Sequence, residues 1–99
     1  MPDIPEELLN LRQGIDEIDA RIVKLLMQRF GLTQQVGELK ARKALKAFDP
    51  QREADKLDRL MALCTNSQLD PELVRELFTR IMQEVVKNHR RLREAQDPG

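Results

Sequence analysis

The sequence predicts an all-α protein with three helices per chain, one long and two shorter, that pairs with a second copy as a homodimer. An apolar heptad pattern, with spacings that alternate between four and three residues, defines a first helix of roughly 38 residues. Two Asp-Pro pairs, beginning at Asp49 and Asp70, mark the starts of two further helices. No segment shows strand alternation, and 99 residues fit one helical domain, which we place at residues 1–93 with a flexible tail at 94–99.

The first helix is expected to begin within residues 3–7 and to end at about Lys43. Its seam positions are Leu8, Leu11, Ile15, Ile18, Ile22, Leu25, Arg29, Leu32, Val36 and Leu39. Roughly 38 helical residues extend about 57 Å, whereas a compact domain of about 100 residues has a radius of gyration of about 13 Å. The helix therefore projects beyond its own chain, and a twofold dimer would cover the seam. A break near Gly31 or Gly37 would instead give a four-helix monomer.

Two shorter helices follow. The second is expected from Pro50 to about Leu63, and its inward-facing residues are Leu57, Leu60 and Met61. The third begins at Pro71, and its apolar face consists of Val74, Leu77, Phe78, Ile81 and Val85, a row that continues to His89. Residues 44–48 are expected to form a loop, and residues 65–68 a polar turn.

Composition argues against several classes of protein. The 17 Lys and Arg residues balance 17 Asp and Glu residues, so net charge gives no reason to expect nucleic acid or a membrane as a partner. Trp and Tyr are absent, so stacking platforms for single strands are not expected. Cys64 is the single cysteine, which argues against a thiolate zinc site. The N-terminus lacks an apolar signal run, and we expect a cytoplasmic protein.

Several cations lie on or beside the seam of the first helix. Arg29 and Lys40 share one face of the helix, because eleven residues at about 100° each bring the side-chain direction back to within about 20° of its start. The two residues lie about 16 Å apart along the helix axis. Arg12 is about 25 Å from Arg29 along the helix, so in an antiparallel dimer it would serve the ligand of the partner chain. Inward-directed cations suit a small ligand with several carboxylates. A seam arginine can also set helix register or extend to the surface.

The order of these residues resembles the all-helical class of chorismate mutases. The resemblance covers roughly residues 8–89, and its most specific part is the spacing of Arg12, Arg29, Lys40, Arg52 and Glu53. The other matching positions are Leu11, Ile15-Asp16, Ile18-Asp19, Leu25-Leu26, Val36-Gly37, Asp49-Pro50, Leu69-Asp70, Leu77-Phe78 and Ile81. The resemblance implies the type II fold, an intertwined dimer of three-helix chains with two active sites.

The reaction that the resemblance implies is the conversion of chorismate to prephenate, in the shikimate pathway to phenylalanine and tyrosine. This intramolecular Claisen rearrangement needs no metal and no other cofactor. The protein must hold the enolpyruvyl arm over the ring, which is an orientation effect. It must also stabilise negative charge on the breaking ether oxygen.

The resemblance also implies a role for each matching residue. The substrate carboxylates would be bound by Arg29, Arg52 and Arg12 of the partner subunit. Lys40 would contact a carboxylate and the ether oxygen. Glu53 would accept a hydrogen bond from the ring hydroxyl, assisted by the region of Asp49. As an acid in the first turn of a helix, Glu53 would also favour the helix dipole.

Two positions depart from the family pattern. Val85 and His89 stand where the family commonly has Ser and Gln. Val85 cannot donate a hydrogen bond, so one substrate-binding contact is missing or made by water. His89 would donate an imidazole N–H to the ether oxygen as a catalytic residue beside Lys40 and Glu53, or it would merely cap the end of the third helix.

Three alternatives stay open. An isochorismate pyruvate lyase shares the fold and the cations, but these lyases generally lack the carboxylate that Glu53 supplies. A 4-amino-4-deoxychorismate mutase is also compatible, because Glu53 can accept from an amino group. A non-enzymatic helical dimerisation module would tolerate Leu or Met in place of Arg29 or Lys40.

Overall fold

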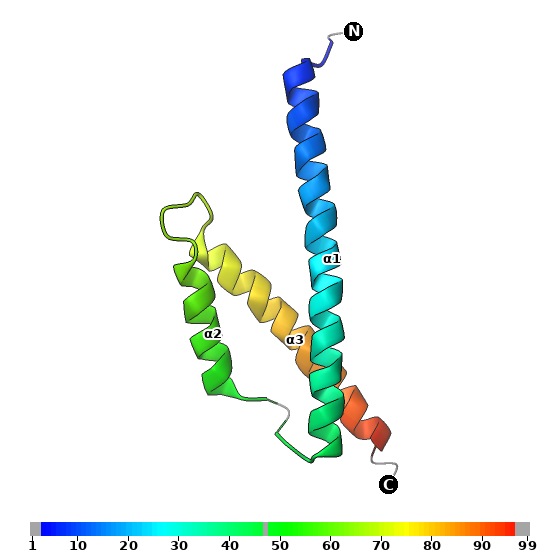
Figure 1. Ribbon diagram of the computed structural model, residues 1–99. Helices are drawn as coiled ribbons and strands as arrows, with labels where there is room; N and C mark the ends of the chain where they lie inside the picture. Colours follow the sequence, from blue (N-terminus) through cyan, green and yellow to red (C-terminus); the bar gives the residue numbers. More distant parts are fainter. Residues whose placement is uncertain (1–2, 47, 97–99) are drawn as a thin grey trace. The chain divides into compact units, whose positions relative to one another are not determined.

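The computed structural model describes residues 3–46 and 48–96, and these residues form three helices. They are α1 (Glu6–Arg42), α2 (Pro50–Ala62) and α3 (Pro71–Gln96), shown in Figure 1. The described ranges contain no β-strand, so the prediction of an all-α chain with one long and two shorter helices is confirmed. The expected loop at 44–48 falls between α1 and α2, although Ala47 lies outside the described residues.

The chain divides into two units, Met1–Leu32 and Thr33–Gly99. The first unit contains the N-terminal part of α1. The second unit contains the last turns of α1 from Thr33 onward, together with α2 and α3. The single domain over residues 1–93 stays a prediction.

The apolar seam of α1 is exposed along the chain. Every apolar seam side chain from Leu8 to Leu39 is exposed, and the exposed fraction reaches 63% at Leu32. Burying a side chain of this size stabilises a protein by about 1.5–3 kcal/mol relative to leaving it in water. One chain by itself therefore leaves a long apolar stripe uncovered. In the part of the chain that is described, no helix combines the length and hydropathy required to cross a bilayer.

The two predicted Asp-Pro helix starts are confirmed. Asp49 has an extended backbone, and its Oδ1 accepts a hydrogen bond from the Arg52 main-chain N–H at 3.2 Å. Asp70 Oδ1 accepts from the Glu72 N–H at 2.9 Å in the same way at the start of α3. Each carboxylate satisfies a helix N–H that has no partner within the helix.

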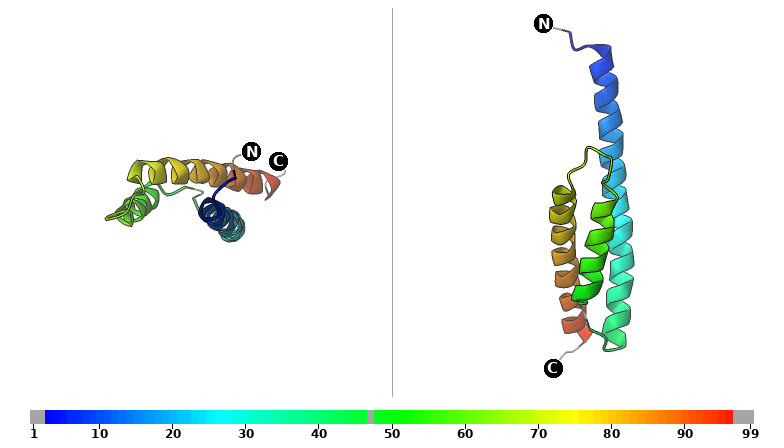
Figure 2. Two further views of the ribbon diagram at one scale, coloured as in Figure 1. Left: turned by 90° about the horizontal axis from the view of Figure 1, so that it is seen from above. Right: turned by 90° about the vertical axis from the view of Figure 1, so that its left-hand side faces the viewer.

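In the second unit, α2 runs antiparallel alongside α3, as Figures 1 and 2 show. The inward-facing residues predicted on α2 are half-buried: Leu57, Leu60 and Met61. Four apolar side chains and one histidine are buried: Cys64, Val74, Ile81, Val85 and His89. The prediction of the apolar α3 face is wrong for Leu77, which is 50% exposed. Helical geometry explains this, since Leu77 points about 80° away from the centre of the row formed by the buried α3 residues.

The end of α3 also differs from expectation. The predicted flexible tail begins at residue 94, but the helix continues to Gln96, and residues 97–99 lie outside the described part. The last turns are held from outside the helix, since the Arg93 guanidinium donates to the main-chain carbonyl of Leu45. His89 consequently lies well inside α3, and the expectation that it caps the helix end is wrong.

Candidate functional site

The predicted site residues are divided between the two units. Arg12, which is exposed, and Arg29, which is half-buried, lie in the first unit. The second unit contains the other predicted residues: Lys40, Asp49, Arg52, Glu53, Val85 and His89. The second unit by itself therefore supplies the catalytic residues predicted from the sequence.

Lys40, at the end of α1, lines a pocket of about 340 Å³. The other lining residues are Lys46, Phe48, Asp49 and Pro50. Two ammonium groups and one carboxylate make this pocket net positive, which suits an anionic ligand. Sequence reasoning did not single out Lys46, because a lysine in a loop is ordinarily a solvated surface residue.

The loop that carries Lys46 is fastened at two points to its surroundings. The Leu45 N–H donates to the Lys40 carbonyl at 2.9 Å, and the Leu45 carbonyl accepts from Arg93 of α3. Ala44, the residue before, has a φ of 53°, in the left-handed region that turns the chain sharply after α1. These contacts place Lys46 on the wall of the Lys40 pocket.

Asp49 and Arg52 act first as parts of a helix start. One carboxylate oxygen of Asp49 is occupied by the main-chain N–H of Arg52, so Asp49 contributes its charge to the pocket while it caps α2. The side chain of Arg52 is exposed. An exposed guanidinium at this point can bind a carboxylate in bidentate geometry.

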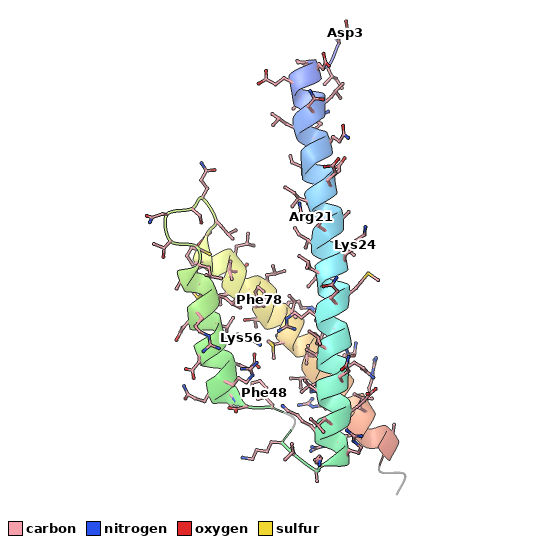
Figure 3. The ribbon with its side chains drawn as sticks, in the orientation of Figure 1. Asp3, Arg21, Lys24, Phe48, Lys56 and Phe78 are labelled. Atoms are coloured by element: carbon pink, nitrogen blue, oxygen red, sulfur yellow. The ribbon has the colours of Figure 1, made fainter. Side chains whose placement is uncertain are left out.

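Glu53 forms the tightest ion pair among those described. Its Oε2 lies 2.7 Å from Lys56 Nζ, one turn later on α2, and the two side chains are only 16% and 18% exposed. Lys56 Nζ also donates to Met82 Sδ of α3 at 3.2 Å. Figure 3 labels Lys56 on α2 and Phe78 on the neighbouring stretch of α3. Sequence reasoning missed Lys56, because Glu and Lys three residues apart on a helix form a common surface pair.

Val85 and His89 are both buried on α3. Val85 is 5% exposed, so it offers only apolar contact. His89 Nε2 lies 2.8 Å from the Thr33 carbonyl oxygen, and because a carbonyl only accepts, Nε2 must carry the proton. His89 Nδ1 is buried and has no hydrogen-bond partner within the described ranges. In this geometry the Nε2–H is engaged by the main chain of α1, so donation of that proton to a substrate ether oxygen stays a prediction that requires the ring to leave Thr33.

A second, more apolar pocket of about 430 Å³ adjoins the first through Phe48. Figure 3 shows Phe48 in the segment that leads into α2. The remaining lining residues belong to α3: Thr79, Met82, Gln83, Val86 and Arg90. Met82 of this lining also accepts the contact from Lys56, the partner of Glu53.

Residues 11–90 match the protein family described as chorismate mutase type II. The chain is 36% identical to the chorismate mutase of Methanocaldococcus jannaschii, over 74% of this chain and 74% of that protein. It is 35% identical to the T-protein of Enterobacter agglomerans over 79% of this chain, and 34% identical to the bifunctional chorismate mutase/prephenate dehydratase of Escherichia coli (strain K12) over 80%. The chain spans only 21% and 20% of the length of these two relatives.

Proposed function

Because the chain belongs to the chorismate mutase type II family, we propose that its cations bind chorismate and direct its rearrangement to prephenate at a site shared by two copies of the chain. The chain is accordingly an isomerase. The observation that carries the assignment of the site is the net-positive pocket in which Lys40 and Lys46 meet Asp49 at the start of α2.

Chorismate carries two carboxylates, and its rearrangement breaks an ether bond as a carbon–carbon bond forms. Lys40 is half-buried, so its ammonium acts in a medium of lower effective dielectric than water. There it stabilises the negative charge that grows on the ether oxygen. Lys46 and the exposed Arg52 bind carboxylate and restrain the enolpyruvyl arm, which lowers the entropic part of the barrier.

A homodimer is the second part of the proposal. The exposed α1 seam is the support, since an apolar stripe of this length is unfavourable in water. In an intertwined pair the seams cover each other, and Arg12 of the partner subunit reaches the substrate carboxylates beside Arg29. Arg12 is exposed on its own chain, which leaves its guanidinium available for this purpose.

Glu53 supports the mutase over the lyase alternative. It is a half-buried carboxylate one residue after Arg52, and it is oriented by Lys56. In the proposed complex one of its oxygens accepts the ring hydroxyl of chorismate. A non-enzymatic helical module has no need of a half-buried acid one helical turn after Asp49, which lines the cationic pocket.

The test is a direct assay of the purified chain with chorismate, isochorismate and 4-amino-4-deoxychorismate, with products identified by chromatography. We expect prephenate from chorismate. Release of pyruvate from isochorismate as the faster reaction would favour the lyase, and no turnover of any of the three compounds would contradict the proposal. A Lys40→Met chain, purified in the same way, controls for contaminating host enzyme.

A further inference from the structure

Glu53, the proposed acceptor of the ring hydroxyl, is paired with a cation that belongs to the same helix. The Glu53–Lys56 pair spans 2.7 Å, with side chains 16% and 18% exposed. A second pair of the same i,i+3 spacing, Glu84–Lys87 on α3, spans 3.7 Å with side chains 32% and 55% exposed. The Glu53–Lys56 pair is therefore shorter and far better shielded from water than its surface counterpart.

Few other groups compete for the Lys56 ammonium. Its second described contact is Met82 Sδ at 3.2 Å, and a thioether is a weak acceptor. Separating Lys56 from Glu53 would leave two half-buried charges without a strong partner, which is unfavourable. The pair consequently stays together when a ligand enters the neighbouring space.

A paired carboxylate and a lone carboxylate select different ligands. A carboxylate has about four lone-pair positions, so Glu53 can hold Lys56 and still accept a hydrogen bond from a neutral hydroxyl. A ligand ammonium at the same place gains attraction from Glu53 but suffers repulsion from Lys56, and the two effects oppose each other. The pair thus favours a hydroxyl over an ammonium.

We propose that Lys56 is a specificity-determining residue, which by pairing with Glu53 makes the site select the ring hydroxyl of chorismate over the ring ammonium of 4-amino-4-deoxychorismate. This inference rests on the proposed function. Lys56 would act through Glu53, and its charge would discriminate between two substrates that Glu53 alone could accept.

The experiment compares Lys56→Met with the unmodified chain and with Lys87→Met, which removes the lysine of the matched surface pair. For each protein, kcat/KM is measured with chorismate, and 4-amino-4-deoxychorismate is tested as a competitive inhibitor and as a substrate. Lys56→Met should shift the preference toward the amine by about tenfold or more, since one opposing charge is removed. Lys87→Met should leave the preference unchanged, and Lys56→Arg, which keeps the charge, should retain most of the original preference.

Further variants keep the test decisive if Lys56→Met loses its fold or all turnover. Lys56→Gln should give the same shift. Glu53→Gln should give the opposite one, because Lys56 then repels the amine without compensation. A preference that stays within twofold of the original in these variants would overturn the inference, as would failure of the amine to bind any of them. If the unmodified chain turns over chorismate and the preference does not move, only the role of Lys56 falls; absence of chorismate turnover contradicts the proposed function itself.

Discussion

His89 of α3 donates its Nε2 proton to the Thr33 carbonyl of α1 across 2.8 Å, and its ring fills the space that a side chain at Gly37 would occupy. A Cβ atom at Gly37 would lie 2.5 Å from His89 Cδ2 and 2.8 Å from Leu92 Cδ1. Gly37 is also the buried residue of α1. Within the second unit, the end of α1 and α3 approach closely here because Gly37 of α1 has no side chain at the point of contact.

Gly37→Ala should destabilise the protein. The methyl group overlaps the His89 ring and Leu92, and overpacking of this kind costs about 1–3 kcal/mol. That cost exceeds the gain of about 1 kcal/mol in helix propensity. Urea denaturation at equal chain concentrations measures the change. Gly14→Ala is the matched control, because no described atom outside its own helix lies within 4 Å of a Cβ built there, and it should stabilise. A Gly37→Ala protein as stable as the Gly14→Ala protein would contradict the packing.

His89→Ala should cost about 2–4 kcal/mol, from a lost hydrogen bond and a cavity. In the Gly37→Ala/His89→Ala double variant the new methyl enters that cavity. The double variant should therefore be more stable than the sum of the single changes by about 1 kcal/mol or more. Strict additivity in the same urea experiment would show that the two positions are not in contact.

The helix starts could be predicted from the sequence because their signals are local. Asp49 and Asp70 each cap a helix through atoms two or three residues away, and such contacts repeat wherever Asp-Pro begins a helix. Periodicity also placed His89 on the buried row of α3. The end of α3 could not be predicted in this way, because Arg93 extends the helix by bonding to Leu45, a residue far away in the chain.

The chemistry at two positions of the proposed site depends on tertiary contacts. The bond from His89 to Thr33 joins residues of different helices, and nothing in the local sequence indicates that the imidazole N–H is already engaged. Lys56 looks like an ordinary surface partner for Glu53 until Met82 of α3 is placed beside it. Residue identity and spacing could suggest residues for the proposed site, but could not indicate which of their polar atoms are occupied.

Lys40→Met should lower kcat by about 10²–10³-fold, because its ammonium acts mainly on charge that appears in the transition state. KM should rise much less, since other cations still bind the substrate carboxylates. Lys43→Met, an exposed lysine of the following turn that does not line the Lys40 pocket, is the control and should keep normal turnover. Equal effects of the two changes on kcat would remove Lys40 from the mechanism.

The Glu84 carboxyl should titrate below the usual glutamate range. A hydrogen bond from Arg80 and the charge of Lys87 hold its pKa below the ordinary value of 4.5. A group with a lowered folded-state pKa contributes stability that is complete above about pH 4.5 and is lost as the pH falls through the folded-state value. Carboxyl chemical shifts followed by NMR should show this lowered pKa, and Arg80→Ala should raise it. An unshifted pKa would show that the pair with Arg80 does not persist in solution.

Chains that carry Arg12→Ala and chains that carry Lys40→Met should restore activity when they are mixed. In the proposed shared site, each pocket combines Lys40 of one chain with Arg12 of the partner subunit, so a mixed dimer contains one intact pocket and one doubly defective pocket. Random exchange makes half of the dimers mixed, and activity should recover to about one quarter of the unmodified value.

The control for this recovery mixes Arg29→Ala chains with Lys40→Met chains. In the proposed shared site, Arg29 and Lys40 of one chain serve the same pocket, so neither pocket of that mixed dimer would be intact, and activity should stay at the parental level. Native mass spectrometry verifies that subunits have exchanged in both mixtures. Recovery in both mixtures would show that Arg29 also crosses to the partner's pocket, whereas recovery in neither would place Arg12 and Lys40 in the same pocket of one chain.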